Sequence, residues 1–448
     1  MVAVTDATNG SAIEGATVQI TGPLAQTTTT GADGTAAFPG IPPGDYSITG
    51  SKAGYMAGSG SATVVSSATN SGTVQLQLVH AALLIKEVAF AGNHVVEQDT
   101  LGNFPTPEWV EARAQQSPLC YTRNASPQLT AKFRVTTQPS GAEAVQVRGT
   151  ATLGAATLQW TGSVNVAPGD NEVTTPTLTS NVPLPNQIGC FDPANITWEF
   201  NPAGAGWAGG GSSGNTLYVT LGDPAGTPAY WTLLDISCRA ASGDTDANTA
   251  VPHFFTPFQG RSLNRKRDGH VLTYWNPNTT TCTSTALLLA AADGSGQCGS
   301  WAEFLIDMCK VHGITGAHKV MIVRTLPEYS SSTTGFLVKN WQFRHPPASS
   351  ATAFTHAMGT ECVKQPGIPG QNNPNPPPAF FNHFIVLFNS TYFDPSYGSS
   401  TVTTQLAWEA AAIDGVFHDP SNKTGFDKSL NSGVKLLEFW DMLTNAKL

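Results

Sequence analysis

The sequence predicts a multidomain protein in which two all-β domains precede an α+β domain. Three observations predict this class: short strand-like runs fill the first half, Gly, Pro and Asn clusters separate them, and helical spacing becomes frequent only after about residue 230. A chain of 448 residues has room for roughly two to four domains. We expect the domains at residues 1–80, 81–229 and 230–448.

The composition limits the partners and the compartment. Charged residues make up only 12% of the chain and the formal net charge is −9, which argues against a nucleic-acid partner. No run approaches the ~20 apolar residues of a membrane span. The composition indicates an extracellular or cell-surface protein. Because "MVAVTDATNG" lacks the features of a secretory signal, we expect a mature or trimmed chain, or another export route.

The first 80 residues have the pattern of a small β-sandwich. Residues Ala16, Val18 and Ile20 alternate onto one face, and an Asp-Gly turn and a Pro-Pro-Gly turn follow. The order of "GATVQIT" and "GADGTAAFPGIPPGDYSITGSKAGY" resembles the carboxypeptidase regulatory-like, or transthyretin-like, sandwich. Such modules are usually spacers or adhesion units. The resemblance therefore implies a surface or protein partner for this domain, and no chemistry.

Regularly spaced short strands between residues 81 and 229 predict an immunoglobulin-like sandwich. We expect a disulfide between Cys120 and Cys190 to stabilise this sandwich. The glycine-rich stretch from Ala203 to Asn215 is expected to be a flexible loop at the tip of a long hairpin. After this domain, Trp231–Ala241 and Thr283–Gly294 are candidate helices that precede strand-like runs, an order that predicts an α+β domain.

Seven cysteines stand at positions 120, 190, 238, 282, 298, 309 and 362. No pair has the C-x-x-C spacing of a zinc ribbon or a thioredoxin-like site, and "DTDAN" at 244–248 lacks the Gly and Glu of a calcium loop. We therefore expect no metal and no cofactor. An odd count in a secreted, disulfide-bonded chain leaves one free thiol, and Cys298 is the candidate.

Cys298 begins an amphipathic helical run that Gly313 ends. On a helical wheel it lies in a wide apolar arc, so it points into the protein, whereas Cys309 and His312 further along have structural roles. Free N–H groups and the dipole at a helix N-terminus stabilise a thiolate and can hold an oxyanion. Gly299 allows close approach of a substrate, and Gln297 could help to polarise the site.

A base for this cysteine is available in "FFNHFIVLFNSTYFDPSYG". His383 opens one strand, Asp394 ends the next, and a tight turn of even length near Asn389 and Ser390 would place them on one face of a hairpin. A core histidine and a turn-capping aspartate are the structural alternatives. The proline-rich segment at 365–378 just before is expected to be a cleft wall, a lid or a plain surface loop.

"GQC" before an apolar helix ending in "HGI", "NH" opening a strand and "FDPS" ending the next resemble the transglutaminase-like cysteine hydrolase superfamily, with its papain-like domain. "CGSWA" is similar to a segment of peptide N-glycanases. The resemblance implies Cys298 as nucleophile, His383 as base and Asp394 as the residue that orients the base. It also implies that the Trp275 indole could donate to an oxyanion, as an upstream Trp does in some members.

These observations lead to an expected function and one alternative. We expect a secreted or surface cysteine hydrolase or acyltransferase, either a peptidase, an amidase or a transglutaminase, acting on protein or peptide amides. The alternative is a non-enzymatic structural or adhesive surface protein that uses the transglutaminase-like domain as a scaffold, since a fold does not by itself confer a function.

Overall fold

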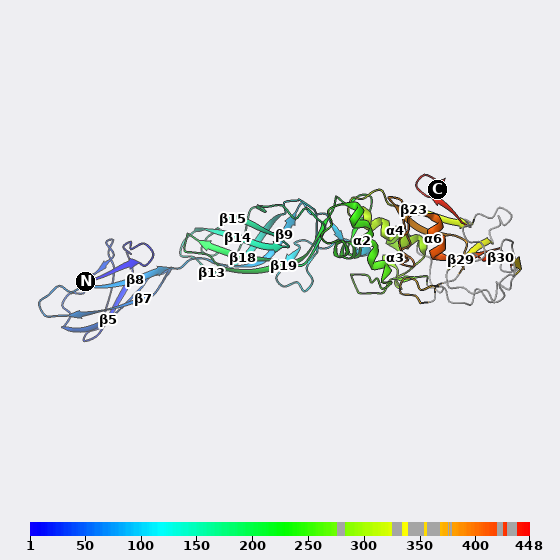
Figure 1. The fold of residues 1–448 in the computed structure, drawn as a ribbon. Coiled ribbons are helices and arrows are strands. Elements are labelled where there is room, and N and C mark those ends of the chain that lie inside the picture. The colour runs from blue at the N-terminus through cyan, green and yellow to red at the C-terminus, as the bar shows by residue number, and fades with distance from the viewer. Residues whose placement is uncertain are drawn as a thin grey trace.

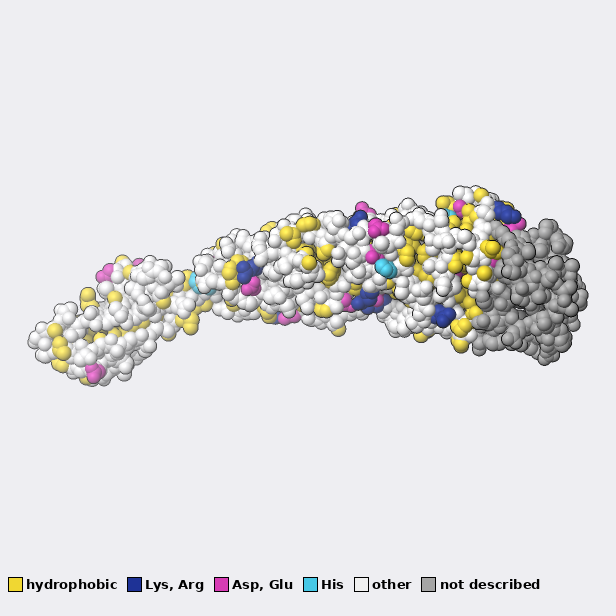
Figure 2. Space-filling view, viewed as in Figure 1, with side chains coloured by type: hydrophobic (Ala, Val, Ile, Leu, Met, Phe, Trp, Pro, Cys, Tyr) yellow, Lys and Arg dark blue, Asp and Glu magenta, His cyan; other side chains and the backbone are white. Residues whose placement is uncertain are grey.

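The computed structural model describes residues 1–275, 283–324, 334–338, 354–355, 368–374, 376, 379–418, 424–427 and 437–448. The chain is elongated, with three units in a row from the N-terminal strands, through a central β unit, to the helices and the last strands (Figure 1). β-strands in several sheets make up most of its regular structure. Charged side chains are sparse on the face in Figure 2, as the 12% of charged residues leads one to expect.

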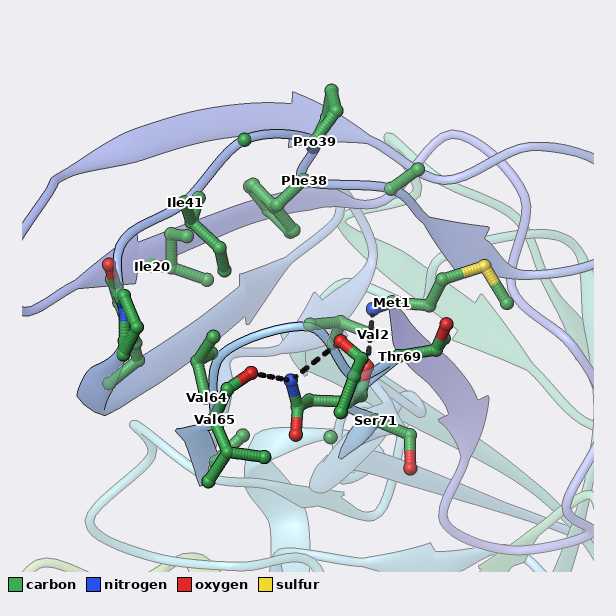
Figure 3. A pocket seen from close by; sticks show the side chains of 18 of the residues that line it. Met1, Val2, Ile20, Phe38, Pro39, Ile41, Val64, Val65, Thr69 and Ser71 are labelled. Carbon is green, nitrogen blue, oxygen red and sulfur yellow. Dashed lines mark hydrogen bonds between the residues drawn. The ribbon is translucent and has the colours of Figure 1, made fainter.

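The first unit is a sandwich of two four-stranded sheets, ordered β4-β1-β8-β6 and β3-β2-β5-β7. Ala16, Val18 and Ile20 are at most 2% exposed, so the predicted sandwich is confirmed. At one end the sheets part around a cavity of about 410 Å³, lined by Ile20, Ile41 and Val64 (Figure 3). Its strands are β1 (Val2–Asp6), β2 (Thr17–Thr21), β3 (Gln26–Thr29), β4 (Thr35–Ala36), β5 (Gly44–Ser51), β6 (Tyr55–Met56), β7 (Gly58–Val64) and β8 (Gly72–Leu78).

The second unit is a larger sandwich, with sheets ordered β11-β9-β13-β16, where β17 also pairs with β13, and β12-β19-β18-β14-β15. Phe133 and Trp198 from the two sheets meet edge to face in its core, with ring centroids 5.6 Å apart. Its elements are β9 (Ala82–Ala91), β10 (Val96–Glu97), η1 (Asp99–Leu101), β11 (Trp109–Val110), β12 (Leu119–Thr122), β13 (Gln128–Thr137), β14 (Glu143–Leu153), β15 (Ala156–Val166), β16 (Glu172–Thr174), β17 (Leu178–Thr179), β18 (Gly189–Pro202) and β19 (Ala208–Thr220).

The prediction of a flexible loop from Ala203 to Asn215 is wrong for most of this stretch, because β19 begins at Ala208 and pairs with β18. One glycine of this stretch, Gly214, fits a close packing requirement there. A Cβ atom on Gly214 would lie 2.5 Å from Oδ1 of Asn195. Gly214 therefore marks a close approach between β18 and β19, and only residues 203–207 form the turn.

The expected disulfide between Cys120 and Cys190 is also wrong. Both residues pair with Tyr218 of β19, one from each side, so two strand spacings of roughly 4.8 Å separate them. That separation exceeds the ~7 Å over which two Cα atoms can be bridged. All five cysteines in the described part of the chain are free thiols, at positions 120, 190, 238, 298 and 309, whereas Cys282 and Cys362 lie outside the described residues.

The third unit has two antiparallel sheets, ordered β28-β27-β23-β31-β32 and β25-β30-β29-β24-β26. Helix α4 packs on β27 and β23, and α1, α2 and α3 pack around α4. The elements of this unit are β20 (Ala229–Tyr230), α1 (Trp231–Ala240), α2 (Ala247–Gln259), β21 (Thr273–Tyr274), α3 (Thr285–Ala290), β22 (Ser295–Gly296), α4 (Cys298–Lys310), β23 (His318–Arg324), β24 (Thr334–Val338), β25 (Phe354–Thr355), β26 (Ala379–Phe380), β27 (His383–Phe388), β28 (Thr391–Phe393), α6 (Gln405–Ala412), β29 (Ile413–His418), β30 (Thr424–Asp427), β31 (Leu437–Asp441) and β32 (Ala446–Lys447).

The second and third units share a hydrophobic core. Val96, Ile188 and Tyr218 of the second unit belong to the same buried cluster as the helices of the third. Strand β10 pairs in parallel with β20, and the buried Asp99 carboxylate accepts hydrogen bonds from the backbone N and the hydroxyl of Thr232, each at 2.9 Å. Asp99 thereby caps the first turn of α1 and joins the two units.

Among the described residues, no helix has both the length and the apolar character that a membrane crossing requires.

Candidate functional site

Cys298 is the first residue of α4, and a cavity of about 510 Å³ opens above it. Its side chain is 5% exposed, because the apolar face of α4 turns it toward the core while the helix end leaves it at the cavity wall. Gln297 is the N-cap in extended conformation, with no side-chain hydrogen bond to the helix. The structure places Gln297, Gly299 and Trp275 in the same lining as Cys298.

Trp275 reaches this cavity through an uncommon backbone conformation. Its φ of 54° lies in the left-handed region, where bulky residues are rarely found. Its backbone N donates a 2.9 Å hydrogen bond to the carbonyl of Gly296, which fixes the Trp275 backbone two residues from Cys298. The indole ring packs edge to face on Phe380, at 6.0 Å between centroids.

The hairpin of β27 and β28 brings His383 and Asp394 together. Asn389 and Ser390 both have positive φ, 45° and 61°, which is the mark of a two-residue type I′ turn. The ladder pairs Phe388 with Thr391 and continues in register, so His383 and Asp394 occupy diagonal positions on one face. Nε2 of His383 lies 3.0 Å from Oδ2 of Asp394, and both side chains are 1% exposed.

The surroundings of His383 determine its protonation. Burial alone would lower its pKa, but attraction and hydrogen bonding by the Asp394 carboxylate, together with the nearby Cys298 thiol, raise the pKa to about 10. Within the described residues no hydrogen-bond partner reaches Nδ1, the ring nitrogen that Asp394 does not bond. That nitrogen is therefore open to a further partner, and a pKa of about 10 corresponds to an imidazole that is protonated at neutral pH.

Aromatic rings enclose the His383–Asp394 pair. The imidazole lies 5.6 Å from the ring of Tyr397, and it stacks on Trp408 of α6 at 6.0 Å with an interplanar angle of 26°. Phe380 lies 5.8 Å away on the cavity side. These rings keep water from the ion pair, and electrostatic attraction is stronger in such a low-dielectric setting.

Gln371 supports the site from the proline-rich segment, and the sequence offered no signal for it. Its side chain is fully buried, and its amide donates to the carbonyls of Phe258 at 2.7 Å and Pro395 at 2.8 Å. Nearby, Asn373 donates to the carbonyls of both residues of the Tyr274–Trp275 pair. The described part of this segment therefore holds the backbone on both sides of the cleft.

The other residues singled out from the sequence have structural surroundings. His312 is buried, its Nε2 lies 2.8 Å from the Ser237 hydroxyl, and burial lowers its pKa to about 3. Burial raises the pKa of the Cys309 thiol. Asp246, in the stretch considered for calcium, caps α2 by accepting hydrogen bonds from two backbone N–H groups. The described residues contain no group of three or more His, Cys, Asp or Glu side chains arranged to hold a metal ion.

The fold of the first unit defines it as a small β-sandwich module. Residues 2–78 match the family model of the carboxypeptidase regulatory-like domain, which confirms the resemblance seen in the sequence of that unit.

No curated protein is detectably similar to the chain in sequence. Among solved structures, BcpA, the major pilin subunit of Bacillus cereus, aligns with a TM-score of 0.19 and 12% identity over 49% of this chain and 68% of its own. Spo0M, a sporulation control protein from Bacillus subtilis, aligns with a TM-score of 0.16 and 12% identity over 35% of this chain and 55% of its own. TM-scores this low support no argument about fold or function.

Proposed function

We propose that the chain is a secreted or surface cysteine hydrolase or acyltransferase whose transglutaminase-like, papain-like domain spans residues 230–448. The observation that carries the proposal is the arrangement of three side chains. The Cys298 thiol, at a helix N-terminus under an open cavity, lies close enough to the His383 imidazole to raise its pKa, and Nε2 of that ring bonds the buried Asp394 carboxylate. This is the arrangement of nucleophile, base and orienting group that acyl transfer requires.

The chemistry follows from the roles of the three groups. The Cys298 thiolate attacks the carbonyl carbon of an amide, and backbone N–H groups in the first turn of α4 are placed to receive the oxyanion. Nδ1 of His383 gives its proton to the departing amine as the C–N bond breaks, which leaves a thioester on Cys298. Water or a second amine then loses a proton to Nδ1 as it attacks the thioester, and the acid or the new amide departs.

Asp394 has a positioning role in this scheme. Its carboxylate holds Nε2–H, which directs Nδ1 toward the thiol and stabilises the imidazolium. The two β units in front, of which we propose the second to be immunoglobulin-like, would present the catalytic unit at a distance from a surface or protein partner. The elongated arrangement of the three units supports this part of the proposal (Figure 1).

The proposal is tested by trapping the thioester. The chain is incubated with a peptide amide library, and with a fluorescent primary amine plus casein, and intact-mass spectrometry follows the covalent intermediate. We expect an acyl adduct that maps to Cys298 and that is absent from Cys298→Ala. Cys190→Ala is the matched control, because Cys190 is a free thiol outside the cavity lining, and this variant should still form the adduct. If the wild-type protein forms neither adduct nor product with any substrate, the enzymatic function is contradicted. That result would favour a non-enzymatic surface protein that uses this domain as a scaffold.

A further inference from the structure

The cavity over Cys298 is walled by aromatic rings. Trp275, Phe380, Phe381 and Phe384 all line it. Phe381 is 49% exposed, whereas Phe380 is largely buried against Trp275. A single exposed apolar side chain is ordinary, but four aromatic residues that line one cavity beside a thiol form a continuous apolar surface.

The charge in this cavity is balanced. Lys319 is the only charged residue among the described ones that line it, and its ammonium is bonded to the carboxylate of Glu303 on α4. The other polar lining residues that the structure describes, Thr283, Gln297 and Asn382, are uncharged. A charged substrate group would therefore lose its hydration in the cavity without gaining an unpaired counter-charge.

Gly299 lines the cavity next to the nucleophile without a side chain of its own. A Cβ atom at this position would contact only the Thr283 carbonyl at 3.6 Å and the Phe384 ring at 3.8 Å, which are ordinary van der Waals distances. The neighbours of Gly299 on this side are therefore one carbonyl and one aromatic ring, and Gly299 adds no side chain of its own to the cavity. A substrate backbone can approach the nucleophile closely over Gly299, and the cavity of about 510 Å³ has room for a side chain beside the reacting carbonyl.

We propose that this cavity selects amide substrates with an aromatic or bulky aliphatic side chain next to the scissile carbonyl, and that it disfavours acidic side chains. The inference rests on the proposed function for the identity of the reacting group. The aromatic wall supplies the apolar contact area, the Lys319–Glu303 pair removes the attraction for a carboxylate, and Gly299 adds no side chain next to the nucleophile.

The first experiment measures binding without chemistry. Peptide amides that differ only in a central Phe, Gly or Asp are titrated into the Cys298→Ala chain by calorimetry. We expect the Phe peptide to bind about tenfold more tightly than the Gly peptide, and the Asp peptide to bind most weakly. Phe381→Ala should remove most of the preference for Phe, whereas Trp207→Ala, a matched control for loss of an exposed aromatic outside the cavity, should leave it unchanged.

The second experiment uses the reactive chain. Peptidyl chloromethyl ketones with the same three side chains alkylate a thiolate with loss of chloride, and their rates at Cys298 are compared with the rate of iodoacetamide. We expect the Phe reagent to react about tenfold faster than the Gly reagent, and Phe381→Ala to slow only the Phe reagent. Equal affinities for the three peptides would overturn the inference. Selective binding with an inert Cys298 would instead sustain the inference and contradict the proposed function.

Discussion

Asp394→Asn removes one charge from a pair whose two side chains are each 1% exposed, and it preserves size and one acceptor oxygen. The rise in the pKa of His383 from 6.5 to about 10 corresponds to roughly 5 kcal/mol of net stabilisation of the imidazolium, after burial has opposed it. Loss of one partner from a buried pair typically costs about 3–5 kcal/mol. We therefore expect Asp394→Asn to lower the free energy of unfolding of the third unit by about 3–5 kcal/mol at pH 6.

The pH dependence has a defined sign. The folded-state pKa of His383 lies above its unfolded value of about 6.5, so its protonation stabilises the fold fully below pH 6.5 and the contribution is lost as the pH rises to about 10. In the Asp394→Asn variant no carboxylate opposes the effect of burial, which lowers the pKa of His383. The imidazole is therefore neutral in the folded variant. The stability difference between the two proteins should therefore be large at pH 6 and small at pH 10.5.

Accessibility of Cys309 reports this unit specifically, because the thiol is fully buried in α4. Urea midpoints are read from its modification by methyl methanethiosulfonate at pH 6 and pH 10.5. Asp244→Asn is the matched control, since Asp244 pairs with the half-exposed His253 and such pairs contribute about 1 kcal/mol or less. Equal destabilisation by Asp394→Asn at both pH values, or a loss below about 1 kcal/mol at pH 6, would show that the His383–Asp394 ion pair does not stabilise this unit.

Two further substitutions test residues that support the site, and the stability of each variant is measured from the urea midpoint of the third unit. Gln371→Ala should cost about 2–4 kcal/mol, because the carbonyls of Phe258 and Pro395 lose their buried donor; a loss below 1 kcal/mol would show that they find other partners. Ser390→Gly should stabilise the unit by about 0.5–1 kcal/mol, because Ser390 has a φ of 61° in the hairpin turn; a destabilised variant would count against the type I′ assignment.

Local patterns made several features predictable. The alternation of Ala16, Val18 and Ile20 gave the buried face of the first sandwich, because strand periodicity alone decides it. The positions of His383 and Asp394 on one hairpin face likewise depend only on a two-residue turn and on register. Such features need no knowledge of distant parts of the chain.

Features that depend on long-range packing could not be predicted. Helix α2 contains Pro252 and Pro257, which normally argue against a helix interior, yet Phe254, Phe255 and Phe258 bury its apolar face in the core of the third unit. Likewise, Gln371 becomes a support for the site only because two distant carbonyls meet it.

The predicted disulfide between Cys120 and Cys190 was wrong for a similar reason. The number of cysteines does not show which strands are neighbours in a sheet. The structure places Tyr218 between Cys120 and Cys190.

The decisive measurement for the pairing of Cys298 with His383 is the rate at which iodoacetamide alkylates Cys298 at pH 6. The rate is compared between the wild-type chain and His383→Ala, and the modified residue is mapped by mass spectrometry. We expect Cys298 to react at least about tenfold faster in the wild type, because the protonated imidazole beside the thiol stabilises the thiolate that reacts. Equal rates in the two proteins would contradict a functional pairing of Cys298 with His383.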